Sequence, residues 1–447
     1  MTSADRLRQP SVKWFLMAAA GYSTGSVIAD PLWSVMATAV ATIFILVGIL
    51  RPKELRIGIH VLGGILALLT ILLADTQGIA RFSIQAESYA IWFLFAVATA
   101  IAVFFARANS MRFVTILLAL STVVVSSLAV LISDWEPSVS SDVFRAHEAA
   151  GDALLAGENP YSAAVVFESG DPNKPDGTLV EGYPYPPPSL LTYALLAGIT
   201  DPRVISVVSW LAVAIGLTAL AARRGPIGSV SVVVLALVTT VPVWRMTLFM
   251  SWTEPLSVAL VGASLVGLAK SRRWGWIGLG IALASKQYLV FASPLVLIHQ
   301  DKQGRRLGWV AMVTASVVAG FPALFGLSGY FTSVVGNALN IGFRPDTQSI
   351  NGAIASLGGD WQLPPWLVIP IVLGLIGIFV RMRLPAAVLP AAGVAILAVT
   401  LLVTSAFPNY WMLVAALSGI SAVVCATGQK GISVSPSNSL TELPTHH

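Results

Sequence analysis

Runs of mainly apolar residues recur along the whole chain, and most are long enough to cross a lipid bilayer as a helix. About 20 such residues span the hydrocarbon core. Only 11% of the 447 residues are charged, against about 25% in soluble domains. The sequence therefore predicts an all-α, polytopic integral membrane protein with about 12 crossing helices. We expect these helices over 13–30, 32–50, 57–74, 88–106, 113–133, 203–221, 228–244, 254–269, 307–326, 365–381, 385–404 and 410–426.

Short basic groups between the apolar runs predict the orientation, because cytoplasmic loops of membrane proteins carry an excess of Lys and Arg. A cytoplasmic N-terminus puts most of the 26 Lys and Arg residues inside. The C-terminus, with a polar tail over 427–447 that we expect to be disordered, is then cytoplasmic as well. The loop 134–202 then faces the exterior, and the stretch 186–200 must lie along the outer interface without crossing. The net charge of +5 is explained by these groups and is no evidence for a nucleic-acid partner.

The apolar stretch 275–298 lies between two basic clusters, one ending at Arg273 and the other beginning at Lys302. If both clusters are cytoplasmic, the stretch must enter the membrane and return as a pair of short helices. We expect the break near "SKQY".

The segment 142–156 in the loop 134–202 has the period of an amphipathic helix. Val143, Ala146, Ala150 and Leu154 fall on one face. Gly157 is placed to end the helix. Asp142, at its start, has two interpretations. It can accept backbone N–H groups of the first turn, or its carboxylate can act as a general base just outside the membrane. The two roles are compatible, since a helix N-terminus favours a negative charge.

Two further motifs each have a structural and a functional interpretation. In "EGYPYPPPS", Tyr183 and Tyr185 are typical of an aromatic belt at the membrane interface, or of a platform for a sugar or lipid. In "VWRMTLFMSWTEP", Arg245 and Glu254 either pair with each other or face an internal cavity.

Lys286 and the loop 340–354 raise the same question. Lys286, inside an apolar run, either snorkels toward the cytoplasm or binds an anion. Arg344, Gln348 and Asn351 belong to an ordinary external loop, or they bind sugar hydroxyls and a phosphate.

The order of these motifs resembles the GT-C superfamily of membrane glycosyltransferases. The chain has a span, then "D…G-x-NPY", "YPYPP" on a non-crossing segment, a "G…K…P" hairpin and a "QS-x-N-G" loop. It is most similar to the branch that includes the polyprenyl-phosphate-mannose-dependent α-mannosyltransferases of actinobacteria. The resemblance covers roughly 113–426. It implies a catalytic module there, with external loops 134–202 and 327–364, after an N-terminal extension of four helices over 1–112.

The resemblance implies a site on the outer side of the plasma membrane and an inverting displacement in cell-envelope biosynthesis. The donor would be a polyprenyl-phosphate-linked sugar, with mannose more common than arabinose. The acceptor would be a glycolipid or glycan, and membrane lipid would surround the protein. Asp142 would be the catalytic base, and Lys286, Arg245 and Arg344 would bind the phosphate. The sugar and acceptor would contact Tyr183, Tyr185, Trp252, Glu254, Gln348 and Asn351.

No cofactor is implied and no cluster commits to a metal, although a divalent cation between a carboxylate and the phosphate stays open. The rival interpretation is a transporter or flippase of a lipid-linked saccharide, for which many spans with a few internal charges are equally suitable. A non-catalytic scaffold agrees less well with the many polar groups at the outer face.

Overall fold

The computed structural model describes most of the chain, and the statements below concern only that part. It comprises residues 12–28, 30–50, 109–131, 142–166, 179–197, 199–222, 225–269, 273–298, 302–336, 347–359, 361–384, 386–404 and 406–427.

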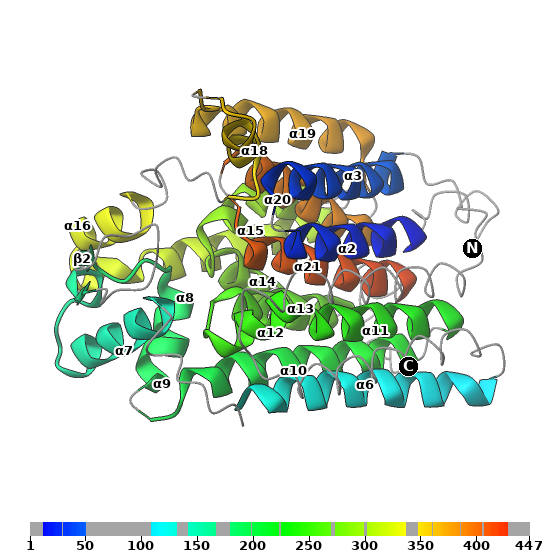
Figure 1. Cartoon of the computed structure of the whole chain (residues 1–447), viewed down its shortest axis with the longest axis horizontal. Helices are drawn as coiled ribbons and strands as arrows, with labels where there is room; N and C mark the ends of the chain where they lie inside the picture. The colour runs from blue at the N-terminus through cyan, green and yellow to red at the C-terminus, as the bar shows by residue number, and fades with distance from the viewer. Residues whose placement is uncertain are drawn as a thin grey trace, which may run out of the picture.

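Long helices form a bundle along the longest axis of the molecule, with a cap of shorter elements at one end (Figure 1). Helix α21 is the most buried of the helices long enough to span and contacts α2, α11, α13 and α20. The long helices are α2 (Val12–Val27), α3 (Pro31–Leu50), α6 (Asn109–Leu131), α10 (Pro202–Ala221), α11 (Gly225–Thr240), α13 (Glu254–Ala269), α15 (Lys302–Ala319), α19 (Val368–Met382), α20 (Leu389–Val403) and α21 (Pro408–Thr427).

Six helices of the described residues are long and apolar enough to cross a membrane, or seven if one bent pair is a single span. The expected count of about 12 crossings is therefore not confirmed. Helices α2, α11 and α20 have 15 or 16 residues, fewer than the roughly 20 that a straight crossing needs. The expected spans 57–74 and 88–106 lie outside the described residues, as does the tail beyond Thr427.

Two breaks interrupt the helices near the capped end. The expected span 228–244 is divided, because α11 ends at Thr240 and Pro242 begins α12 (Pro242–Phe249). Helix α12 then meets α13 at a bend of 99°. The second break separates α14 (Trp274–Leu283) from the 3₁₀ helix η5 (Gln287–Leu297). This break contains Lys286 and confirms the prediction of two short helices that separate near "SKQY".

The first two helices of the expected N-terminal extension pack directly on the rest of the bundle. Helix α2 lies along α21, where the rings of Tyr22 and Trp411 stack with 5.8 Å between their centroids. The hydroxyl of Ser26 is hydrogen-bonded to the sulfur of Met412 at 2.9 Å. Helix α3 contacts α20 and the short helix α18 (Ile350–Ser356). Helix α2 thus contributes to the packing around α21.

The cap is built from short elements, most of which follow α6. The expected non-crossing segment is helical over Pro187–Ala197, which is too short to span, and comprises α8 (Pro187–Ser189), η3 (Leu190–Ala194) and α9 (Leu195–Ala197). The strands β1 (Ala164–Val166) and β2 (Leu179–Glu181) pair antiparallel and are an exception to the predicted all-α fold, which is otherwise confirmed for the described residues. The other short elements of the chain are α7 (Asp142–Leu155), η2 (Pro160–Ser162), η6 (Phe321–Leu324), α16 (Leu327–Tyr330), η7 (Phe331–Gly336), η8 (Pro365–Leu367) and η9 (Ala386–Val388).

Helix α7 confirms the predicted amphipathic helix in both its faces and its end. Val143, Ala146 and Ala150 are buried, whereas Asp152 is exposed. The helix ends before Gly157, which has the left-handed φ of +75° that favours glycine. Its buried face lies against η3 and α9. The approach is close at Gly151, because a Cβ atom there would overlap the carbonyl oxygen of Ala194.

This contact predicts that Gly151→Ala destabilises the docking of α7 by about 1–3 kcal/mol, since neither backbone can move without losing its packing. Gly216→Ala on α10 is the matched control, because the added Cβ would meet nothing closer than 3.9 Å. It should be neutral or slightly stabilising. Thermal unfolding of the purified protein in detergent measures both, and equal melting temperatures would contradict the close contact.

Candidate active site

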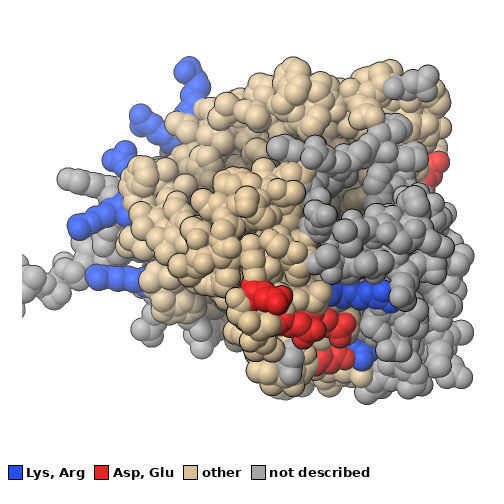
Figure 2. All heavy atoms as spheres, turned by 90° about the vertical axis from the view of Figure 1, so that its left-hand side faces the viewer, with Lys and Arg blue, Asp and Glu red and all other residues tan. Residues whose placement is uncertain are grey.

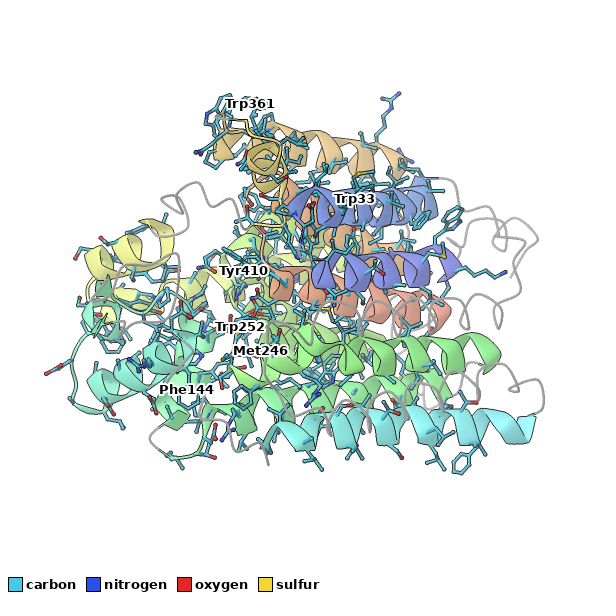
Figure 3. The ribbon with its side chains drawn as sticks, in the orientation of Figure 1. Trp33, Phe144, Met246, Trp252, Trp361 and Tyr410 are labelled. Carbon is cyan, nitrogen blue, oxygen red and sulfur yellow. The ribbon has the colours of Figure 1, made fainter. Side chains whose placement is uncertain are left out.

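Five segments meet where the cap joins the bundle. They are the start of α7, the "YPYPP" segment, the α12–α13 break, the α14–η5 break and the start of α21. Figure 3 labels Phe144 on α7, together with Trp252 and Tyr410 at the ends of bundle helices. Hydrogen bonds tie the segments together, since Gln287 donates to the carbonyl of Pro184 at 2.9 Å.

A buried ion pair joins the two helix breaks. The ammonium Nζ of Lys286 lies 2.6 Å from Oε1 of Glu254, and the two side chains are 3% and 0% exposed. Lys286 also donates to the hydroxyl of Thr253. Two alternatives left open by the sequence are therefore wrong. Glu254 pairs with Lys286 and not with Arg245, and Lys286 does not snorkel.

Three tyrosine rings surround this lysine. Nζ of Lys286 lies 5.0 Å from the ring centroid of Tyr185, 5.5 Å from that of Tyr410 and 5.7 Å from that of Tyr288. Such distances allow a cation–π attraction from each ring. The hydroxyl of Tyr288 donates to Oε1 of Glu254 at 3.4 Å. The cation is thus held by one carboxylate and by three tyrosine rings, and these rings come from segments that are far apart in the sequence.

The second oxygen of Glu254 remains available. Within the described part of the chain, Oε2 is buried and has no hydrogen-bond partner. A buried carboxylate oxygen without a donor is costly, and a bound hydroxyl group could supply that donor. Glu254 therefore binds Lys286 with one oxygen, while the other oxygen has no donor among the described residues.

Asp142 takes the first of the two roles that the sequence left open, while its role as a base stays a prediction. Its Oδ1 accepts the backbone N–H of Val143 at 2.8 Å, so it binds a donor of the first turn. It also lies close to Tyr185. Burial raises the pKa of Tyr185 well above its usual range, and the charge of Asp142 raises it further, ahead of smaller effects of Tyr410 and Glu254. The charges of both Asp142 and Glu254 therefore act on Tyr185.

A second aromatic cluster lies behind Tyr185. The hydroxyl of Tyr183 is 2.9 Å from Nδ1 of His147, and the imidazole stacks on Tyr193 with 4.5 Å between centroids. All three side chains are buried. Burial also raises the pKa of Tyr183 well above its usual range. Tyr183 is thus a neutral donor committed to His147, whereas Tyr185 is only half-buried.

The other residues selected from the sequence have different surroundings. Trp252 is half-buried in the α12–α13 break, and Arg245 is buried on α12. The side chain of Gln348 donates to the carbonyl of Ile28 at 2.7 Å. The amide of Asn351 accepts the N–H of Leu363 at 2.7 Å. Both amides hold backbone segments, and Arg344 lies outside the described residues.

Sequence reasoning missed His147, Tyr193, Tyr288 and Tyr410. Two of them carried a usable signal. His147 is four residues after Val143 and therefore falls on the apolar face of the predicted helix, where a polar ring needs a partner. Tyr288 belongs to the "SKQY" break. Tyr193 and Tyr410 had no such signal, because an aromatic residue in an apolar segment is typical of core packing.

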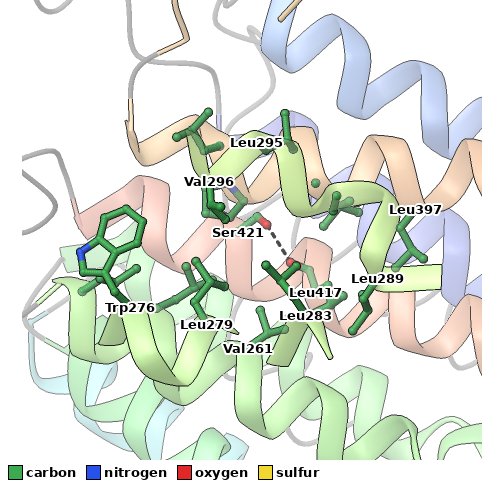
Figure 4. A pocket seen from close by; sticks show the side chains of 17 residues that line it. Val261, Trp276, Leu279, Leu283, Leu289, Leu295, Val296, Leu397, Leu417 and Ser421 are labelled. Carbon is green, nitrogen blue, oxygen red and sulfur yellow. Dashed lines mark hydrogen bonds between the residues drawn. The ribbon is translucent and has the colours of Figure 1, made fainter. Parts of the chain in front are cut away.

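An apolar cavity of about 120 Å³ begins beside the Lys286 break (Figure 4). Leu283 before the break and Leu289 after it both line the cavity, together with residues of α13, α20 and α21. Ser421 is the exception in an otherwise apolar lining, and its hydroxyl donates to the carbonyl of Leu417 at 2.8 Å. The cavity is therefore suited to a hydrocarbon chain and not to a sugar.

The outer surface of the cap is acidic near α7. Figure 2 shows a group of acidic side chains on this face, where Glu148, Asp152 and Glu158 are exposed on α7 and just beyond its end. Among the described residues, no group of three or more His, Cys, Asp or Glu side chains could hold a metal ion. These exposed acids are separate from Asp142 and Glu254, whose charges act on Tyr185.

The comparisons with known proteins give one match. A family model described as "Glycosyltransferase family 87" matches residues 183–408, just over half of the 447 residues. The matched segment includes Tyr185, Glu254 and Lys286, while Asp142 precedes it. No curated protein and no solved structure matches the chain.

The buried ion pair predicts a large and coupled loss of stability. Glu254→Gln or Lys286→Met alone leaves an uncompensated charge or polar group and should lower the free energy of unfolding by about 3–5 kcal/mol. The double variant should lose less than the sum of the two. Arg273→Gln, which removes an exposed cation at the start of α14, should change it by less than about 0.5 kcal/mol. Denaturant unfolding in mixed micelles measures all four, and additive losses would show that the pair is not coupled.

Proposed function

Because the chain belongs to glycosyltransferase family 87, a family of GT-C-type membrane glycosyltransferases, we propose that it transfers a sugar from a polyprenyl-phosphate donor. The acceptor is a lipid-linked or cell-envelope glycan. Mannose is the proposed sugar and arabinose the alternative, on the resemblance of the motif order to actinobacterial mannosyltransferases. The family favours transfer over transport, so the transporter or flippase is not retained.

The order of chemical environments at the site supports this donor. A polyprenyl-phosphate sugar places a polar ring, an anionic phosphate and a long apolar chain in series. The site places Asp142 and Tyr185, then the Lys286 cation, and then the apolar cavity that begins at Leu283 and Leu289. The order of polar, charged and apolar groups along the site thus matches their order along the donor. This correspondence is the observation that carries the proposal.

The proposed reaction is one inverting displacement. The acceptor hydroxyl oxygen forms a bond to the anomeric carbon while the bond from that carbon to the phosphate oxygen breaks. The hydroxyl proton passes to the carboxylate of Asp142, which acts as general base. The bonding pair leaves with the phosphate, and polyprenyl phosphate is released with one more negative charge.

Lys286 is the proposed partner of that developing charge. Glu254 already neutralises Lys286 in the structure, so the phosphate would share the ammonium with this carboxylate. Arg245 and Arg344 are additional candidates for the phosphate. A divalent cation between a carboxylate and the phosphate is not part of the proposal.

The two tyrosines of the "YPYPP" segment take different parts. Tyr185 is the proposed sugar contact, because it is half-buried beside both carboxylates and no hydrogen bond to its hydroxyl occurs within the described residues. Tyr183 supports it through the ring contact at 5.5 Å. Trp252 and Glu254 complete the proposed sugar and acceptor site, while Gln348 and Asn351 would act at most through the backbone that they hold.

The proposed location is the plasma membrane, with both termini in the cytoplasm and the site at the outer face. The basic groups between the apolar runs support this orientation. Arg305 and Arg306 of one such group and Arg381 of another are exposed. A site at the outer face needs no nucleotide donor, because the phosphate leaving group is already attached to the lipid.

Asp142→Asn tests the proposed base. The purified protein, given labelled polyprenyl-phosphate mannose and a glycolipid acceptor, should release polyprenyl phosphate, and the variant should lose about 10²–10⁴-fold in kcat. The amide cannot take the hydroxyl proton. Asp152→Asn is the matched control on the exposed face of the same helix and should keep full activity. Near-normal turnover by Asp142→Asn would refute its role as base.

A further inference from the structure

His147 connects the cap to the bundle at one specific backbone group. It lies on α7, five residues after Asp142, and is 0% exposed. Its Nε2 is 2.9 Å from the carbonyl oxygen of Ser251. Ser251 belongs to the α12–α13 break, where the chain turns by 99°, and it has a φ of +54° that non-glycine residues rarely adopt. A helix of the cap thus contacts the most distorted backbone near the site.

The partners of the imidazole determine its tautomer. A carbonyl can only accept, so the hydrogen of the neutral ring must be on Nε2 and is donated to Ser251. Nδ1 then accepts the hydrogen of the Tyr183 hydroxyl, which lies 2.9 Å away. Both ring nitrogens are therefore used, and no hydrogen-bonding capacity of the ring is left for a substrate.

Tyr193, which stacks on the imidazole of His147, also binds the α12–α13 break. It stacks on His147 with an angle of 10° between the planes, and its hydroxyl donates to the carbonyl of Trp252 at 3.4 Å. Consecutive carbonyls of the break, at Ser251 and Trp252, are thus bound by residues of the cap. Glu254 begins α13 only two residues further on.

We infer that His147 is a positioning residue that fixes the distance between Asp142 and the Glu254–Lys286 pair. The inference rests on the proposed function, which assigns Asp142 to the acceptor side of the anomeric carbon and Lys286 to its phosphate side. Asp142 and His147 are about 7–8 Å apart along one rigid helix, and Ser251 is three residues before Glu254. The hydrogen bond from His147 to Ser251 therefore links the helix that carries Asp142 to the break that precedes Glu254.

A role for His147 as the base itself does not agree with its surroundings. Burial lowers the pKa of His147 to about 3, and the nearby charge of Lys286 also lowers it against the opposing effect of the Ser251 carbonyl. The ring is therefore neutral at any pH near 7, with both nitrogens occupied. Its contribution passes through the elements that it joins.

Two variants separate the hydrogen bond from the shape of the ring. His147→Phe keeps a planar ring that can stack on Tyr193 but has no donor for Ser251. His147→Gln lacks the ring but carries an amide N–H near the position of Nε2. With polyprenyl-phosphate mannose as donor, His147→Phe should lower kcat by about 10²-fold, as expected for a misplacement of about 1 Å. KM for the donor should be unchanged, and His147→Gln should recover most of kcat.

The result that overturns the inference is a kcat of His147→Phe within about threefold of the wild type. An equal loss in both variants would also overturn it, because the hydrogen bond would then have no separate effect. A loss confined to KM would assign His147 to donor binding, which contradicts positioning.

Hydrogen–deuterium exchange of the full-length protein in micelles tests the same bond without any substrate. His147→Phe should speed the exchange of backbone amides in 250–254, and His147→Gln should not. If the exchange changes as expected but the wild type transfers no sugar, the proposed function fails while the structural tie stands. If the exchange is unchanged in His147→Phe, the positioning role fails whatever the activity.

Discussion

The ion pair between Glu254 and Lys286 is the interaction on which the rest of the site depends. Two charges inside an apolar bundle are stable only with close geometry and further hydrogen bonds, and Thr253 and Tyr288 supply those bonds here. Each charge lies at a helix break, where the backbone leaves the helical pattern and turns toward the cap. The pair therefore fixes two breaks against each other. The tyrosine rings around Lys286 belong to segments that pack against these two breaks, so the position of the breaks determines the position of the rings.

The cap adds to the bundle the polar and aromatic groups that a reaction at this site needs. The bundle alone offers an apolar cavity and one neutralised lysine, whereas α7 and the "YPYPP" segment add a carboxylate and an aromatic wall. The close packing at Gly151 and the bond from His147 to Ser251 hold α7 in place. Polar, charged and apolar surroundings thus follow one another across a short distance, as they do in a lipid-linked sugar phosphate.

The sequence predicted what depends on local pattern and missed what depends on packing. Helix α7 was predicted because its apolar period and Gly157 are local signals, and the "SKQY" break followed from the length of the stretch between two basic clusters. Asp142, Glu254 and Lys286 were each selected, but the pairing of Glu254 with Lys286 across 32 residues was not. Tyr193 and Tyr410 were missed because an aromatic ring in an apolar segment is typical of a core, whereas the position of His147 on the apolar face of α7 was a signal that was not used. Hydropathy cannot distinguish a straight crossing from a broken one, so the number of crossings was not confirmed.

A structure of the protein with a bound polyprenyl-phosphate sugar would show whether Lys286 and Asp142 have their proposed roles. We expect the phosphate to contact Nζ of Lys286 and the prenyl chain to enter the cavity between Leu283 and Leu289. Asp142 should lie on the opposite side of the anomeric carbon from the phosphate. A phosphate bound away from Lys286, or a different carboxylate facing the anomeric carbon, would contradict these roles.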